Sequence, residues 1–419
     1  MTPCEPSGSK VLSRRAALSL LAAGSVEFVT RSARADVAGS GASKDAVLVC
    51  VFLRGAADGL NIIVPYTDRD YYRLRPTIAV APPGKPDGAL DLDGQFGLNP
   101  RLAALKPAYD AGELAFVHAV GSPHPSRSHF EAQDALQTAT PGQRSTHEGF
   151  LARYLREKPG ARDSDLRAFA FTDRVPLALR GYEDALCVER LGQLGAIGER
   201  ELGSTLGDGF AKLYANGTER ATRSGKRALD VSARLHAIAQ TNAPPENGAS
   251  YDPGARSFAE LARLLKADIG LETAWLDVGG WDTHRYQGGA ERGDLPKRLD
   301  MLGKALAAFR ADLGPRFERV VVVVMTEFGR TAKENGTGGT DHGRGSAMLV
   351  LGGPVRGGRL YGDFPGLTPD ALYERRDVAV TTDFRSVLGE VIEKHLGLRD
   401  TAKVFPGFSP KSAPLGLIG

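Results

Sequence analysis

Short apolar runs recur along the chain, and stretches with a helical pattern separate them. Residues 46–53 are continuously apolar, and similar runs occupy residues 114–120, 274–277, 320–325 and 347–351. Such runs are typical of strands that are covered on both faces of a parallel sheet. Residues 299–309 instead repeat apolar positions at the spacing of an amphipathic helix. This alternation predicts an α/β fold with a mainly parallel sheet flanked by helices.

The N-terminal segment has a different pattern. Arg14 and Arg15 precede a modest apolar run, residues 16–23, and residues 33–35 form a small-x-small cleavage site. These features predict a signal peptide over residues 1–35, and the paired arginines indicate the twin-arginine export machinery. The apolar run is far shorter than the ~20 residues of a membrane span. We therefore expect a periplasmic or secreted protein without a stable membrane anchor.

The rest of the chain reads as one domain. Residues 36–44 are small and polar and are predicted to be a linker, and residues 45–419 form a single α/β domain. Residues 183–271 have a helical pattern and are expected to form a helical insertion that covers one side of the sheet. Apolar strands on both sides of this insertion contribute to the same sheet, which argues against a separate domain.

Charge and cysteine content exclude some classes of function. The chain has 53 basic and 50 acidic residues, of which the first 35 residues hold five and two, leaving 48 of each. A neutral mature chain gives no electrostatic reason to expect a nucleic acid partner. Cys50 and Cys187 are too few for a disulfide framework or a multi-cysteine zinc site, and we expect two buried thiols.

Carboxylates and imidazoles stand next to the predicted strands, where ligands of open α/β sheets bind. Such side chains, converging at strand ends, are the donors that a divalent metal requires. Each also has a purely structural interpretation: a turn, a loop salt bridge, or an ion pair with Arg330. The candidate metal ligands are Asp58, Asp282, His284, Glu327, Asp341 and His342.

A further segment offers a nucleophile. Residues 121–131 follow a predicted strand and open a helix, and they contain Ser126, Arg127 and His129 as candidate catalytic residues. Ser128 with Glu131 fits a capping box, so Ser126 is the preferred nucleophile, near the positive end of the helix. A serine hydroxyl needs a metal or base to activate it. Arg54, Arg127 and Arg330 are candidates to hold the oxygens of an ester.

These motifs together resemble a bacterial family of exported proteins, the domain-of-unknown-function family 1501. That family is grouped with the alkaline phosphatase and sulfatase superfamily. The resemblance covers nearly the whole mature chain. It is carried by the paired arginines and by residues 52–61, 126–130, 280–284, 327–331 and 339–343.

The resemblance implies an alkaline-phosphatase-like fold with one or two divalent metal ions (zinc, magnesium, manganese or calcium) and a nucleophile at Ser126 or Ser128. Asp58 resembles the ligand that follows the first strand, and Asp282 with His284 resembles an aspartate–histidine pair. Asp341 and His342 resemble a later aspartate-histidine-glycine motif; alternatively, Glu327 fills that position and His342 is the last histidine ligand.

The sequence also departs from that superfamily. One residue separates Asp282 from His284, where the superfamily has three, and Pro123 stands where a sulfatase has its modified cysteine. The leading hypothesis is an exported metal-dependent hydrolase of a phosphate or sulfate ester. The alternative is a catalytically inactive, metal-stabilised binding or assembly protein on the same fold, since a fold does not determine an activity.

Overall fold

The computed structural model describes residues 45–143, 146–158, 166–195, 220–241, 243–410 and 413–419. The predicted signal peptide (residues 1–35) and linker (residues 36–44) lie outside this part of the chain. Among the helices that are described, none combines the length and the apolar character of a membrane-spanning segment.

A nine-stranded sheet forms the centre of the described structure. Its strand order is β11-β5-β10-β9-β1-β8-β6-β7, and β12 pairs with β5 beside that row. The strands are β1 (Val47–Leu53), β5 (Leu114–Gly121), β6 (Ala168–Phe171), β7 (Ala185–Cys187), β8 (Thr273–Val278), β9 (Val320–Met325), β10 (Ser346–Gly352), β11 (Arg359–Tyr361) and β12 (Thr382–Asp383). A separate small sheet joins β2 (Ile63–Val64), β4 (Gly97–Leu98) and β3 (Leu90–Asp91).

Most strand pairs in the large sheet are parallel. Strand β1 pairs in parallel with both β8 and β9, and β6 pairs in parallel with β8 and β7. Strand β10 runs antiparallel to both of its neighbours, β9 and β5. The sequence prediction of an α/β fold with a mainly parallel sheet is therefore confirmed.

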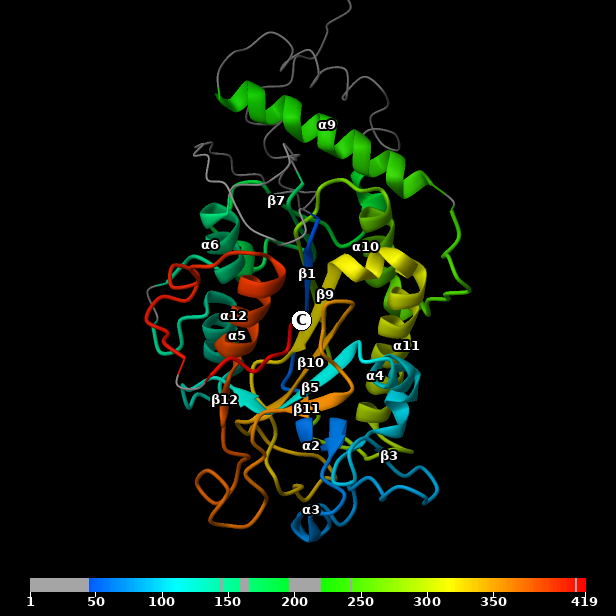
Figure 1. Cartoon of the computed structure of the whole chain (residues 1–419), viewed down its shortest axis with the longest axis vertical. Coiled ribbons are helices and arrows are strands. Elements are labelled where there is room, and N and C mark those ends of the chain that lie inside the picture. The colour runs from blue at the N-terminus through cyan, green and yellow to red at the C-terminus, as the bar shows by residue number, and fades with distance from the viewer. Residues whose placement is uncertain (1–44, 144–145, 159–165, 196–219, 242, 411–412) are drawn as a thin grey trace, which may run out of the picture.

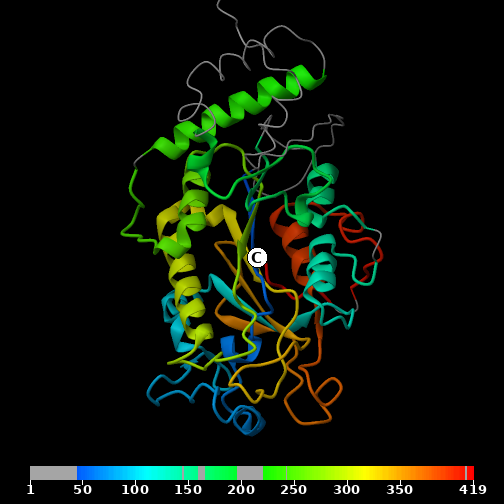
Figure 2. The ribbon, with the colours of Figure 1, turned by 180° about the vertical axis from the view of Figure 1, so that it is seen from behind.

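The apolar strands are buried on both faces because each face carries its own layer of helices. In β1, Val47, Val49 and Val51 belong to one apolar core, and the alternating residues Leu48 and Cys50 belong to the other. This alternation follows from the two-residue period of a strand. Figures 1 and 2 show α10, α11 and α4 on one side of the sheet and α5, α6 and α12 on the other.

The α-helices of the described part of the chain are short to medium in length. They are α2 (Gly59–Ile62), α3 (Arg69–Leu74), α4 (Lys106–Asp110), α5 (His129–Thr138), α6 (Phe150–Glu157), α9 (Arg220–Gln240), α10 (Arg256–Lys266), α11 (Asp294–Leu313) and α12 (Phe384–Glu390). Cys50 and Cys187 are both buried and form no disulfide with each other, as expected.

The expected helical insertion differs from the structure in one respect. Within residues 183–271 the described part contains α9 and α10, but it also contains β7, which pairs with β6 at the edge of the large sheet. The stretch is therefore joined to the sheet by a strand and is not purely helical. A three-residue strand gave too short an apolar run to distinguish from the helical pattern around it.

Candidate metal centre

The candidate residues come together because five chain segments meet at one edge of the sheet. Strands β1, β5, β8 and β9 end at this edge, and β10 begins there because it runs the opposite way. The segments that follow β5 and β8 and the connection from β9 to β10 therefore become neighbours. Figure 1 shows these loops at the end of the molecule opposite to α9.

Two stretches of the connection between β9 and β10 also pair with each other directly. Arg330 and His342 form an antiparallel bridge, with Thr331 donating to the carbonyl of Asp341 over 2.9 Å. Glycine allows this close packing: a Cβ atom on Gly343 would lie 2.3 Å from the backbone of Arg330. The glycines around His342 thus serve loop packing.

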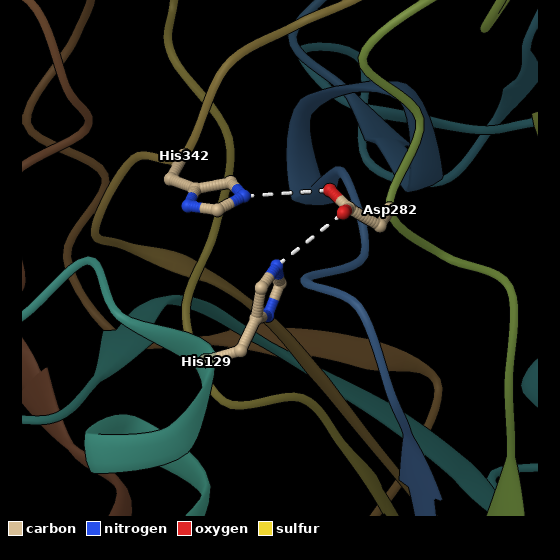
Figure 3. Close-up of side chains that lie close together, drawn as sticks. All are labelled: His129, Asp282 and His342. Carbon is tan, nitrogen blue, oxygen red and sulfur yellow. Dashed lines mark ion pairs between the residues drawn. The ribbon is translucent and has the colours of Figure 1, made fainter.

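The centre of the site is formed by His129, Asp282 and His342. One ligand atom from each lies within 4.8 Å of the others, an arrangement that could hold a metal ion. Nε2 of His129 is 3.5 Å from Oδ2 of Asp282, and Nε2 of His342 is 3.4 Å from Oδ1. Figure 3 shows the two imidazoles approaching the two carboxylate oxygens from different sides. His129 comes from the start of α5, so the segment predicted to carry the nucleophile supplies one of the three candidate ligands.

His284 is a fourth member of the cluster. Its Nε2 is 3.0 Å from Oδ1 of Asp282 and 2.9 Å from Nε2 of His342. Its Nδ1 is 3.1 Å from Oδ1 of Asp341, whose carboxylate also accepts from Nδ2 of Asn335. Asp341 thus contacts His284 from outside the cluster, and the two predicted residues act as a carboxylate–imidazole pair.

The other ring nitrogens are held so that Nε2 faces the centre. Nδ1 of His342 is 2.8 Å from the carbonyl oxygen of Arg127, which can only accept, so Nδ1 must carry a hydrogen. Nδ1 of His129 is 2.8 Å from Oε1 of Glu327. In a neutral imidazole this leaves the lone pair on Nε2, and metal-binding histidines in proteins are oriented in this way.

Glu327 orients a histidine and does not reach the centre itself. Its buried carboxylate accepts hydrogen bonds from His129, Gln133, Thr326 and the backbone of Gly55. Burial raises the pKa of this carboxyl, but the hydrogen bonds from His129 and Gln133 outweigh burial and the net pKa is lowered. The hydrogen bond to Glu327 in turn raises the pKa of His129.

Arg330 fixes Asp282 and does not face an open site. Its side chain is fully buried and donates to Oδ1 of Asp282 over 2.6 Å. Its remaining donors reach the backbone carbonyls of Ala56, Gly55, Trp281 and Thr340. Burial raises the pKa of Asp282, but the Arg330 bond outweighs it, so the carboxylate stays charged. Arg330 is therefore a positioning residue and not the expected ester clamp.

The donor set fits a metal ion. Nε2 of His129 is buried yet has no hydrogen-bond partner, which is costly unless another group satisfies it. Burial also lowers the pKa of His342, which favours the neutral, ligating form of its imidazole. Imidazole nitrogens with one carboxylate suit zinc or another transition metal better than magnesium or calcium.

Asp58 lies apart from this cluster. Its carboxylate is 1% exposed and forms an ion pair with Arg75, with contacts of 2.6 and 3.0 Å, and it also accepts from Gln287. Both oxygens are therefore occupied, and the surroundings of Asp58 do not support its predicted role as a metal ligand. Arg75 follows Asp58 by 17 residues in a stretch with no recognisable motif, so sequence reasoning missed it.

Ser126 is also engaged elsewhere. Its hydroxyl donates to Glu131 over 2.7 Å and accepts from the backbone N–H of Ser128. Ser128 is the N-cap residue of α5 as expected, but its side chain makes no capping hydrogen bond, and the side chain of Glu131 is bonded to Ser126. The contacts of Ser126 therefore give no support for its role as the nucleophile.

The two remaining arginines are paired with carboxylates. Arg54 contacts Asp277 at 2.7 Å, and Arg127 contacts Asp377 at 2.5 Å as well as Glu374. Arg54 also donates to Gln133, which links it to Glu327. Gln133 was not predicted, although it follows His129 by four residues and so shares its helix face. Both arginines are therefore engaged by neighbouring side chains in the structure.

Comparison with known proteins places this site within a family. No curated protein matches the chain. The profile of the family described as "Protein of unknown function (DUF1501)" matches residues 109–407, well over half of the chain. The matched part contains His129, Asp282, His284 and His342, whereas Asp58 and Arg75 precede it. The chain therefore belongs to the DUF1501 family.

Proposed function

We propose that the protein is a metal-dependent hydrolase. The observation that carries the proposal is the convergence of His129, His342 and Asp282, with the two imidazoles oriented by hydrogen bonds at Nδ1. A divalent ion in such a donor set acts as a Lewis acid and lowers the pKa of bound water. Asp282 is 45% exposed at its side chain, so water and a substrate can reach the site.

The residues around the centre have separable tasks in this proposal. His129, His342 and Asp282 bind the metal, while Glu327 and Arg330 hold them in place. His284 is the candidate to complete the ligand set or to accept a proton at Nε2, because Asp341 fixes its other nitrogen. Water replaces Ser126 as the attacking group, since Ser126 is bonded to Glu131.

The substrate class rests on the family resemblance. We propose an ester of phosphate or sulfate on an alkaline-phosphatase-like fold, as that superfamily implies. The described residues provide one cluster that could hold a metal ion, so we propose a single ion. Zinc is the metal that we expect first, and manganese is the second choice.

A second candidate function has its own support. Ser126, Arg54 and Arg127 are all engaged by carboxylates or side-chain amides in the structure. This favours a metal-stabilised binding or assembly protein that lacks ester hydrolysis, because the arginines expected to hold a phosphoryl or sulfuryl group are already bonded to other side chains. The two candidates share the metal centre and differ only in turnover.

A substrate panel separates the two candidates. The zinc-loaded protein is assayed with p-nitrophenyl phosphate, bis(p-nitrophenyl) phosphate and p-nitrophenyl sulfate, beside His342→Ala and the matched control Ser126→Ala. The hydrolase proposal expects turnover of at least one ester by wild type and Ser126→Ala, and a loss of at least about 100-fold in His342→Ala. A metal-loaded wild type that turns over none of the esters would leave the binding protein as the better account.

We also propose export through the twin-arginine machinery to the periplasm or beyond. The proposal rests on Arg14 and Arg15 and on the cleavage site around Ala35. Replacing both arginines by lysine should retain the precursor inside the cell, as cell fractionation would show. Unchanged export of that variant would contradict this route.

A further inference from the structure

A groove opens next to the metal centre. Its volume is about 410 Å³, and its walls come from residues 77–87, 286–292 and 337–338. Tyr286, on one wall, follows His284 by two residues, and Thr337, on another, donates its hydroxyl to the carbonyl of His284 over 2.8 Å. The walls are therefore continuous with the metal-binding loop. A groove of this size is typical of sites for small organic molecules.

Tyr286 presents its ring to solvent at this groove. Within the described part of the chain, the exposed large hydrophobic side chains are Tyr286, at 60%, and Phe130, at 85%. Phe130 adjoins His129 in the sequence, and Tyr286 follows His284 by two residues; of the two, Tyr286 lines the groove. Single exposed aromatics are ordinary, but one that lines a groove indicates a binding surface.

The backbone at Tyr286 is held in an unfavourable conformation. Its φ of 47° lies in the left-handed region, which an aromatic residue rarely adopts. Two hydrogen bonds maintain it: its N–H donates to Thr337 over 3.1 Å, and its carbonyl accepts from Asp294 over 3.0 Å. Such strain is concentrated at functional positions. Here it fixes the direction from which the ring enters the groove.

The other lining residues combine a flat surface with polar groups. Pro86 contributes apolar surface, and Glu291 and Arg292 are exposed on the wall that carries Tyr286. A carboxylate can accept from a hydroxyl group and a guanidinium can donate to one. The ligand that matches an aromatic face with hydroxyl-binding groups at its edge is a ring bearing several hydroxyl groups.

We propose that this groove binds a sugar ring, with Tyr286 stacking on its apolar face and Glu291 and Arg292 contacting its hydroxyl groups. The proposal rests on the proposed function and deepens it, because the sugar would be the part of the substrate that lies beyond the metal centre. The ester group would then extend from the groove toward Asp282 and His342.

Binding of sugars without an ester tests the groove separately from catalysis. Saturation-transfer NMR is recorded on the mature protein, with and without zinc, using glucose, galactose, mannose and N-acetylglucosamine, and with phenol and benzyl alcohol as aryl probes. At least one sugar should receive saturation in wild type under both conditions. The signal should persist in Tyr286→Phe and fall at least about fivefold in Tyr286→Ala.

Phe130→Ala is the matched control, since it removes an exposed aromatic that does not line the groove. It should leave sugar binding unchanged. The proposal is overturned if no sugar binds, if only the aryl probes bind, or if Tyr286→Ala binds as well as wild type. Sugar binding is also measured without zinc, so the result does not depend on whether the protein binds a metal ion. A protein that binds no metal ion would be recognised separately, by its metal content.

Discussion

Two acidic residues follow neighbouring strands of this sheet. Their surroundings leave one carboxylate available to a ligand and the other unavailable. Asp58 follows β1 and Asp282 follows β8, and each forms an ion pair with a buried arginine, Arg75 or Arg330. Arg75 and Gln287 occupy both oxygens of Asp58. Arg330 occupies only Oδ1 of Asp282 and leaves Oδ2 facing His129. The kind of partner thus distinguishes the two carboxylates: Asp58 faces a guanidinium and an amide, which cannot bind a metal ion with it, whereas Asp282 also faces imidazoles, which can.

The difference extends to the neighbouring side chains. Around Asp58 the buried polar atoms are satisfied: Arg75 also donates to Asn61 and to the carbonyls of Thr331 and Ala332. Around Asp282 the imidazole nitrogens face one another and Nε2 of His129 has no hydrogen-bond partner. The first network is complete without a ligand, and the second becomes complete with one.

The largest effect is expected from Asp58→Asn. It leaves the buried guanidinium of Arg75 without its counter-charge, so the free energy of unfolding should fall by about 3–5 kcal/mol. The same change at Asp282, in metal-free protein, also removes the counter-charge of a buried guanidinium, that of Arg330, but it should cost less because Asp282 is half exposed and water can reach its carboxylate. Urea unfolding in the presence of a chelator measures both. Equal losses in the two variants would remove the distinction between the sites.

The next effect is the stabilisation by metal. Zinc at about 100 times its dissociation constant should stabilise the wild type by about 2.7 kcal/mol, because it binds only the folded state. Asp282→Asn should lose most of this stabilisation. Asp58→Asn should keep it, although its free energy of unfolding without zinc is lower than that of the wild type. Thermal unfolding with and without zinc provides the measurement. Full zinc stabilisation of the Asp282→Asn variant would contradict the assignment.

A smaller effect is expected from Glu327→Gln. The change removes the charge that orients and polarises His129, and such outer contacts contribute about 10–100-fold to metal affinity. Zinc titration against a competing chelator measures the change. Glu131→Gln is a matched control on α5, the helix that carries His129, because the Glu131 carboxylate bonds Ser126. If both variants bind zinc as the wild type does, Glu327 has no part in the centre.

The smallest effect is expected from Ser126→Ala. Ser126 makes only exposed hydrogen bonds to Glu131 and the backbone of Ser128, so stability should change by less than about 0.5 kcal/mol and kcat by less than about twofold. A kcat for ester hydrolysis that falls by a factor of about 10³ or more would instead return Ser126 to the role of nucleophile.

The location of the site was predictable from sequence, because it depends on strands and their ends. The apolar runs at β1, β5, β8, β9 and β10 are long enough to read as buried strands, and in a mainly parallel sheet their following loops share an edge. Asp282, His284 and His342 stand in those loops. Their convergence therefore follows from topology.

The roles within the site were less predictable. Glu327 and Asp282 look alike as carboxylates after strands, and only the partners of each decide which one faces the centre. Those partners, His129 and Gln133 for Glu327 and Arg330 for Asp282, come from other segments. Likewise, Asp58 reads as a ligand until Arg75, 17 residues later, is seen beside it. Such pairing is a tertiary property with no local signal.

The account depends most directly on whether the histidine and aspartate cluster holds a metal ion. The decisive measurement is the metal content of protein purified without chelators, by mass spectrometry, for wild type and the double variant His129→Ala/His342→Ala. We predict close to one transition metal ion per wild-type chain and less than about one tenth of that in the folded double variant. A wild type without stoichiometric metal, or a double variant that retains it, would contradict the account.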